Sequence, residues 1–172
     1  CGFGGTLRLL DGQLSRVRFT GVNIDPRQID LARSGDWRNP VDWLLCDAAQ
    51  FSTGRTRWAD HIVSLEAMFH FPDLSGFFAA CAQALRPGGR MVTSTILFGA
   101  GASTASVGSV CQGFSPWPYP EMTLDDLCAM ATDAGLSVLH TENLATMCLP
   151  SFDWMCPPCP PDLTDKPVTE LR

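Results

Sequence analysis

Short strand-like runs alternate with helical patterns along most of this chain. Val17–Ile24 alternates apolar and polar residues and Trp43–Cys46 is a short apolar run, both typical of β-strands. Asp25-Pro26 between them provides a helix cap followed by a proline in the first turn. A strand, a helix and a second strand in this order normally form a right-handed crossover between parallel strands. The alternation therefore predicts a doubly wound, mostly parallel α/β fold.

The same alternation extends over most of the remaining chain. Further strands are predicted at 60–66, 90–97 and 136–140, and further helices at 6–14, 74–85 and 123–134. Residues 1–150 are therefore interpreted as one domain, in which residues 99–120 form a long loop rich in glycine, serine and alanine. Residues 151–172 are rich in proline and lack periodicity, so we expect a disordered tail. Cys156 and Cys159 in this tail lack partners with metal-ligand spacing and receive no assigned role.

Charge and composition exclude several classes of function. The chain has 12 Lys and Arg residues against 18 Asp and Glu residues, a net charge of -6, which disfavours binding to nucleic acid. No apolar run is long enough to span a bilayer, so no membrane partner is expected. The eight cysteines are mostly isolated in apolar segments, which indicates reduced thiols. We expect a soluble, cytoplasmic protein without a metal; the oligomeric state is left open.

Three polar or glycine-rich positions fall where a nucleoside would bind in such a fold. Gly2-Phe3-Gly4-Gly5 forms a turn before a helix, where the backbone can approach a ligand closely. Asn23 ends the next predicted strand, at the place where dinucleotide-binding folds hold the ribose hydroxyls. Asp47 ends the strand after that and can accept a hydrogen bond from an adenine amino group. Together these positions predict a nucleoside-binding crevice.

The glycine pattern favours a cofactor without phosphates. A dinucleotide fingerprint would place glycine or alanine three residues after Gly4, where Leu7 stands. A Gly-Lys-Ser/Thr phosphate loop is also missing from the sequence. These departures point to S-adenosyl-L-methionine, which needs ribose and adenine contacts but no phosphate cradle.

Four motifs in this order resemble those of class I S-adenosylmethionine-dependent methyltransferases. They are Cys1-Gly2-Phe3-Gly4-Gly5, Gly21-Val22-Asn23-Ile24-Asp25, Cys46-Asp47-Ala48 and Leu85-Arg86-Pro87-Gly88-Gly89-Arg90. The likeness covers roughly residues 1 to 145. The segment Glu66–Asp73 is similar to that of the branch that methylates small molecules, the methyltransferase type 11-like branch. The resemblance implies a Rossmann-like fold and methyl transfer to an oxygen, nitrogen or carbon atom of a small-molecule acceptor.

The resemblance also implies roles for residues that bind S-adenosyl-L-methionine. Gly2 and Gly4 would lie against its methionine and ribose parts. Asn23 would bind the ribose, with Ile24 beside the adenine ring. Asp47 and Ala48, the remaining two cofactor positions, would meet the adenine edge.

Two further residues are implied on the acceptor side. Glu66 would open the substrate side near the methionine end of the cofactor. His70 matches a histidine that deprotonates the acceptor hydroxyl in several members of this branch, a role suited to a group that titrates near neutrality. Thr95 stands where those members carry a carboxylate partner for the histidine.

The resemblance leads to one expectation about the sheet and leaves two other functions open. The family's fold has a central strand directly before the glycine turn, so we expect an N-terminally truncated fragment with an interrupted sheet and low stability or activity. One alternative is a catalytically silent binding module that has lost the cofactor, which Asn23 favours. The other is a nicotinamide-dependent oxidoreductase, which Leu7 and Pro87-Gly88-Gly89 disfavour.

Overall fold

The structure is a computed structural model that describes residues 1–97, 118–119 and 121–148. Contacts divide the chain into two units, Cys1–Val138 and Leu139–Arg172. The described part of the second unit contains a helical turn in which the Cys148 N–H donates to the Leu144 carbonyl at 3.0 Å. The tail and nearly all of the loop predicted at 99–120 lie outside the described residues, and the domain boundary at residue 150 remains a prediction.

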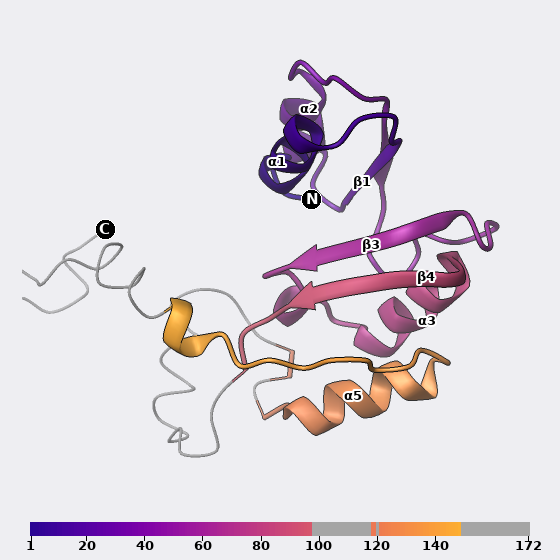
Figure 1. Ribbon diagram of the computed structural model, residues 1–172, viewed down its shortest axis with the longest axis vertical. Helices are drawn as coiled ribbons and strands as arrows, with labels where there is room; N and C mark the ends of the chain where they lie inside the picture. The colour runs from indigo at the N-terminus through magenta and orange to yellow at the C-terminus, as the bar shows by residue number, and fades with distance from the viewer. Residues whose placement is uncertain (98–117, 120, 149–172) are drawn as a thin grey trace, which may run out of the picture. The chain divides into compact units, whose positions relative to one another are not determined.

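Parallel strands in the first unit form two small sheets (Figure 1). Strand β1 (Phe19–Asn23) pairs with β2 (Val41–Leu45), and β3 (Ala59–Leu65) pairs with β4 (Leu85–Ser94). Among the described strands no ladder joins one sheet to the other. The described strands are therefore parallel but interrupted, as the sequence predicts.

The helices begin where the sequence predicts them. They are α1 (Gly5–Gln13), α2 (Pro26–Arg33), α3 (Leu74–Ala84) and α5 (Leu124–Asp133), with a short 3-10 helix η1 (Met68–His70) after β3. The Asp25 carboxylate accepts from the Arg27 N–H at 2.9 Å and so caps α2. Thr123 and Asp126 form a capping box at the start of α5. None of the helices in the described ranges is long and apolar enough to cross a membrane.

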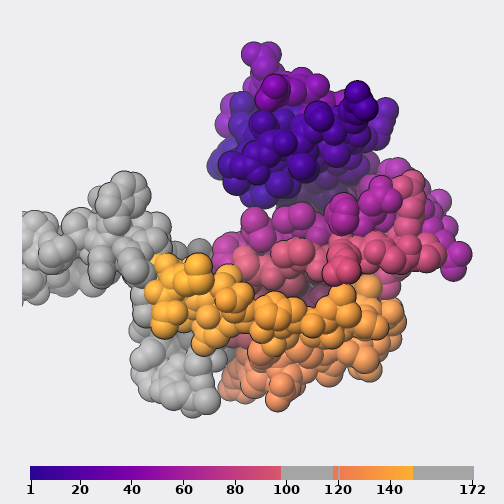
Figure 2. Space-filling view, in the orientation of Figure 1, coloured from indigo at the N-terminus to yellow at the C-terminus, as the bar shows by residue number. Residues whose placement is uncertain are grey.

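Most of the apolar core surrounds α3. Its fully or nearly fully buried members come from the loop after β2, from β3, η1, α3 and α5: Phe51, Ala59, Met68, Leu74, Phe77, Phe78, Ala80, Cys81, Ala84 and Leu127. Helix α5 packs alongside α3 (Figure 1), and its orange atoms lie at the lower edge of the space-filling view (Figure 2). Val22 of β1 and Leu44 of β2 pack against this core. The core therefore also supports the strands that lead to the predicted cofactor residues.

A polar network holds the region around α1. The Asp11 side chain is 4% exposed and accepts from the Arg38 N–H at 2.8 Å and the Asn39 N–H at 2.9 Å. The Asn39 side chain donates to the same carboxylate at 2.8 Å. These bonds tie α1 to the segment that leads into β2. Trp37 adds an edge-to-face contact with Trp43, with ring centroids 5.4 Å apart.

One predicted strand boundary and one predicted strand are wrong. Strand β4 starts at Leu85 rather than Arg90, because Leu85 pairs with Ala59 before a register shift returns the ladder at His61 and Arg90. The turn motif therefore forms an irregularity within the strand. Residues 136–140 form no strand in the described part of the chain. An alternating pattern becomes a strand only where a neighbour supplies ladder partners, and no described residue does so here.

Candidate functional site

The glycine turn lies beside the end of β1. The N-terminal ammonium of Cys1 donates to the Val22 carbonyl at 2.6 Å, and the Gly4 N–H donates to the Cys1 carbonyl at 3.0 Å. Gly4 has a φ of 84°, and a methyl group on it would lie 3.2 Å from the Trp37 ring. Gly2 has a φ of 53° and open space beside its Cα. The turn therefore needs glycine for conformation and packing at Gly4, and leaves Gly2 approachable.

Asn23 connects the glycine turn to the start of α2. Its Nδ2 donates to the Gly2 carbonyl at 3.4 Å and to Oε1 of Gln28 at 2.8 Å. Its Oδ1 accepts from the Asp25 N–H at 3.2 Å. The side chain is half-buried, so it remains accessible to a ligand. Asn23 and Gly2 are thus brought together as the sequence predicts for a shared site.

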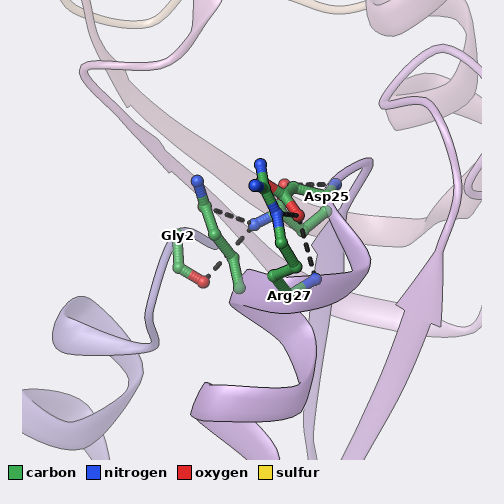
Figure 3. A network of polar contacts seen from close by, with 5 residues as sticks. Gly2, Asp25 and Arg27 are labelled. Atoms are coloured by element: carbon green, nitrogen blue, oxygen red, sulfur yellow. Dashed lines mark hydrogen bonds and ion pairs between the residues drawn. The ribbon is translucent and has the colours of Figure 1, made fainter.

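The Asp25 carboxylate is occupied by its neighbour Arg27. Figure 3 shows the Arg27 side chain beside Asp25, and the guanidinium donates to the carboxylate at 3.2 and 3.0 Å. The hydrogen bonds from Arg27 hold the pKa of Asp25 below its usual value. Both groups are therefore engaged with each other, and the α2 start offers no free cation for a phosphate.

The end of β2 adds the predicted adenine-side residues. The Cys46 N–H donates to the Asn23 carbonyl at 3.0 Å, which sets Asp47 next to the end of β1. Asp47 Oδ1 accepts from the Ala49 N–H at 2.8 Å, so its second oxygen is left for other partners. Ala48 packs against the apolar core, and Ile24 is 68% exposed. Ile24 therefore offers an exposed apolar surface, whereas the Ala48 side chain is committed to the core.

Glu66 and His70 lie on the segment that follows β3. Glu66 has a φ of 49°, an uncommon conformation for a residue other than glycine. Its Oε1 accepts from Ser94 Oγ at 2.7 Å, and its N–H donates to the Ser94 carbonyl at 3.0 Å. His70 ends η1 and is exposed, with its ring centroid 4.2 Å from that of Phe69. The catalytic roles of Glu66 and His70 remain predictions.

The chemistry of the donor set fits a neutral nucleoside. Asn23 and Asp47 supply hydrogen-bond acceptors at adjacent strand ends, and the glycine turn supplies an open backbone at Gly2. The Arg27 guanidinium at the start of α2 is bound to Asp25. Parallel strands place ligand sites at their carboxyl ends. The described ranges contain no group of three or more metal-ligating side chains. Fold and site together define an α/β protein whose polar strand ends lie beside a glycine turn.

Comparison with known proteins places this architecture in a family. A family described as "Methyltransferase domain" matches residues 1–93, more than half of the chain. The chain therefore belongs to the methyltransferase-domain family, and the resemblance inferred from the motifs is confirmed.

Similar proteins of known name agree with this assignment. O-methyltransferase cnsE of Penicillium expansum is 27% identical over 156 residues, 88% of this chain and 55% of that protein. A ubiquinone biosynthesis O-methyltransferase of Aromatoleum aromaticum is 29% identical over 97 residues, 55% of this chain and 42% of that protein. The chain spans about half the length of the curated relatives it matches.

The fold class is confirmed by a solved structure. Phosphoethanolamine N-methyltransferase 2 of Haemonchus contortus, solved with S-adenosyl-L-methionine, superposes with a TM-score of 0.74. The superposition covers 99% of this chain and 40% of that chain, at 20% identity. At this identity the likeness establishes the fold alone.

Two side-chain contacts at the site were not predicted from the sequence. Gln28 meets Asn23 because α2 turns back beside the end of β1, and Ser94 meets Glu66 because Leu65 and Ser94 are register partners. The helical cap at Asp25 could have indicated the first contact, since it fixes where α2 starts. The second depends on a strand register that the sequence does not specify.

Proposed function

We propose that this chain binds S-adenosyl-L-methionine and transfers its methyl group to a hydroxyl of a small-molecule acceptor. The observation that carries the proposal is the junction of the glycine turn with two strand ends. Asn23 contacts Gly2 through its side chain and Cys46 through its carbonyl, which brings the residues proposed for the ribose close to those proposed for the adenine. Family membership and the names of the O-methyltransferase relatives support methyl transfer to oxygen. The cofactor, when bound, supplies a methyl group on a sulfonium.

The chain's residues would then divide the work between binding and proton removal. Gly2 and Gly4 would lie against the methionine and ribose parts of the cofactor. Asn23 would accept a hydrogen bond from a ribose hydroxyl, and Asp47 would accept one from the adenine amino group. His70, exposed at the end of η1, would take the proton of the acceptor hydroxyl. Glu66 would act on the acceptor side, held by Ser94. Most of the rate would come from aligning donor and acceptor.

Cofactor binding is tested by calorimetric titration with S-adenosylhomocysteine. Asp47→Asn retains the oxygen that accepts from Ala49, but can turn an amide donor toward the adenine amino group. We expect about a tenfold weaker affinity, the effect of one lost hydrogen bond to a charged group. Asp36→Asn removes the same charge at an exposed position and should leave affinity unchanged. Equal affinities for both variants would contradict the role of Asp47.

The role of His70 requires a separate measurement. With radiolabelled S-adenosyl-L-methionine and a panel of phenols and catechols, His70→Asn should lower the transfer rate by about 10²- to 10⁴-fold, the usual contribution of a general base. Affinity for S-adenosylhomocysteine should not change. An unchanged rate would remove His70 from the mechanism.

The two alternative functions, a silent binding module and an oxidoreductase, predict different ligand binding. A silent module that has lost the cofactor would stay folded and show no binding of S-adenosylhomocysteine. A nicotinamide-dependent oxidoreductase would bind a dinucleotide, which the family match and the engaged Arg27 disfavour. Titration with both ligands separates these cases from the proposed methyl transfer.

A further inference from the structure

Tyr119 joins the start of α5 to the segment that carries His70. Its hydroxyl donates to the Pro72 carbonyl at 2.6 Å, although the two residues are 47 positions apart in the chain. The Tyr119 carbonyl in turn accepts from the Met122 N–H at 3.3 Å, and Met122 packs against the apolar core just before α5. Tyr119 is therefore anchored to the core on one side and to the connection between η1 and α3 on the other.

Pro72 is the exposed middle of the connection between η1 and α3. Upstream, Met68 is 2% exposed and anchors η1 in the core. Downstream, the Asp73 carboxylate caps α3 by accepting from the Gly76 N–H at 2.8 Å. Pro72 itself is exposed and has no N–H, so a hydrogen bond can hold its backbone only through the carbonyl. The Tyr119 hydroxyl supplies that hydrogen bond.

The backbone at Pro72 limits where His70 can lie. His70 ends η1 two residues earlier, and two residues of fully extended chain span about 7 Å. η1 is a single 3-10 turn, in which the His70 N–H donates to the Ala67 carbonyl at 3.0 Å, and such turns have poorer hydrogen-bond geometry than an α-helix. The His70 side chain is exposed, so burial does not fix it. Its placement depends on the backbone of residues 70–72.

We propose that Tyr119 is a positioning residue for His70, and that its hydrogen bond to Pro72 holds the imidazole where it can take the proton of the acceptor hydroxyl. This inference rests on the proposed function, because it concerns the same proton transfer. The role requires no contact between Tyr119 and the acceptor or the cofactor. A general base works only within hydrogen-bond reach of the proton that it takes, so a small displacement of the segment lowers the rate without changing cofactor binding.

The test is a kinetic double-mutant cycle with Tyr119→Phe and His70→Asn. Tyr119→Phe removes the hydroxyl and keeps the ring, and transfer is measured with radiolabelled S-adenosyl-L-methionine and the panel of phenols and catechols. With His70 present, the substitution should lower kcat about tenfold, less than the roughly 10²-fold cost of a misplacement of about 1 Å. With His70→Asn it should have no further effect, because there is no imidazole to place. Affinity for S-adenosylhomocysteine should stay the same.

Thr132→Val is the matched control. Thr132 Oγ1 donates to the Cys128 carbonyl at 2.8 Å on α5, so this substitution also removes a hydroxyl that donates to a backbone carbonyl. It should leave kcat unchanged. An unchanged kcat in Tyr119→Phe, or the same loss with and without His70, would overturn the role of Tyr119 while leaving the proposed function intact. If the unsubstituted chain neither binds S-adenosylhomocysteine nor transfers a methyl group, the proposed function fails and the inference fails with it.

A second measurement needs no acceptor. The chain has three histidines, His61, His70 and His140, so labelling with ¹³C-histidine gives three sets of ring signals in an NMR spectrum. Tyr119→Phe should move the ring signals of His70, assigned with His70→Asn, and leave the other two in place, because neither lies on the segment between η1 and α3. Signals that all stay in place would contradict the proposal. Shifts of similar size at all three histidines would also contradict it, since they would indicate a general change of structure.

Discussion

Two regions of this molecule are held together by different forces. The glycine-turn region, residues 1–47, relies on polar contacts such as those of Asp11, and few of its apolar residues are fully buried, chiefly Ile29 and Ala32. The aromatic-core region, residues 51–97 and 121–138, is built around Phe77, Phe78 and their neighbours. The predicted cofactor residues lie almost entirely in the first region.

The contrast shows why the binding residues can be polar and accessible. Side chains such as Asn23 and Asp47 must keep free hydrogen-bonding capacity, which is incompatible with deep burial unless partners are supplied. The aromatic-core region buries most of the apolar surface, and Val22 and Leu44 rest against it. Stability is therefore concentrated in one region, and the residues proposed to bind the ligand lie almost entirely in the other.

The largest effect is expected when the aromatic core is damaged. Phe77 is 4% exposed and stacks edge-to-face on Phe71, with centroids 4.9 Å apart. Phe77→Ala should lower the free energy of unfolding by about 3–5 kcal/mol, through lost burial and a residual cavity. Both regions should become less stable, because Val22 and Leu44 of the glycine-turn region pack against the core that Phe77 helps to form. Urea denaturation monitored by circular dichroism gives the change.

A matched phenylalanine in the other region provides the control. Phe3 is 60% exposed, so Phe3→Ala should change the free energy of unfolding by no more than about 0.5 kcal/mol. Comparable losses for the two variants would mean that stability is not concentrated in the aromatic-core region.

The sequence predicted the fold well where local chemistry decides it. Asp25 caps α2 and Thr123 caps α5 as the residue types indicate, because a cap depends on neighbours a few residues away. The early start of β4 and the missing strand at 136–140 were not predictable, because strand pairing depends on distant partners.

The contacts of the candidate site also differ in how far they could be predicted from local sequence. The approach of Asn23 to Gly2 could be predicted, because the family motifs fix both positions in the fold. The contact with Gln28 was not predicted, although the helical cap at Asp25 fixes where α2 starts and could have indicated it. The bond between Glu66 and Ser94 requires the register of β3 and β4, which no local pattern specifies.

An intermediate effect is expected at the glycine turn. Gly4→Ala should lower the free energy of unfolding by about 1–2 kcal/mol, the usual penalty of a left-handed conformation for a residue with a Cβ. The contact with Trp37 at 3.2 Å adds to this strain. Affinity for S-adenosylhomocysteine should fall as well, since the turn must shift. Urea denaturation and calorimetry measure the two effects.

Gly12→Ala is the matched substitution within the same region. Gly12 lies in α1 with open space around its Cα, so the added methyl should stabilise the protein by about 0.5–1 kcal/mol through lower backbone entropy in the unfolded chain. Changes of opposite sign in the free energy of unfolding for the two alanine variants would locate the strain at the turn. Changes of the same sign would contradict it.

The smallest effect is a loosening of the glycine-turn region in acid. Hydrogen bonds from Arg38 and Asn39 hold the pKa of Asp11 below its ordinary value of 3.8, with burial acting against them. The ionised carboxylate therefore stabilises the folded state above pH 3.8, and this contribution is lost as the pH falls through the lowered pKa of the folded state.

Hydrogen exchange resolves this acid effect by region. As the pH falls below 3.8, protection of the β1 and β2 amides should decrease more than that of the β3 and β4 amides, after correction for intrinsic exchange. Asp11→Asn cannot titrate, so it should show lower protection of β1 and β2 at neutral pH and no further regional difference in acid. Asp36→Asn, at an exposed position, should behave like the unsubstituted chain. If both sheets lose protection in parallel, the polar network does not stabilise the glycine-turn region independently of the aromatic core.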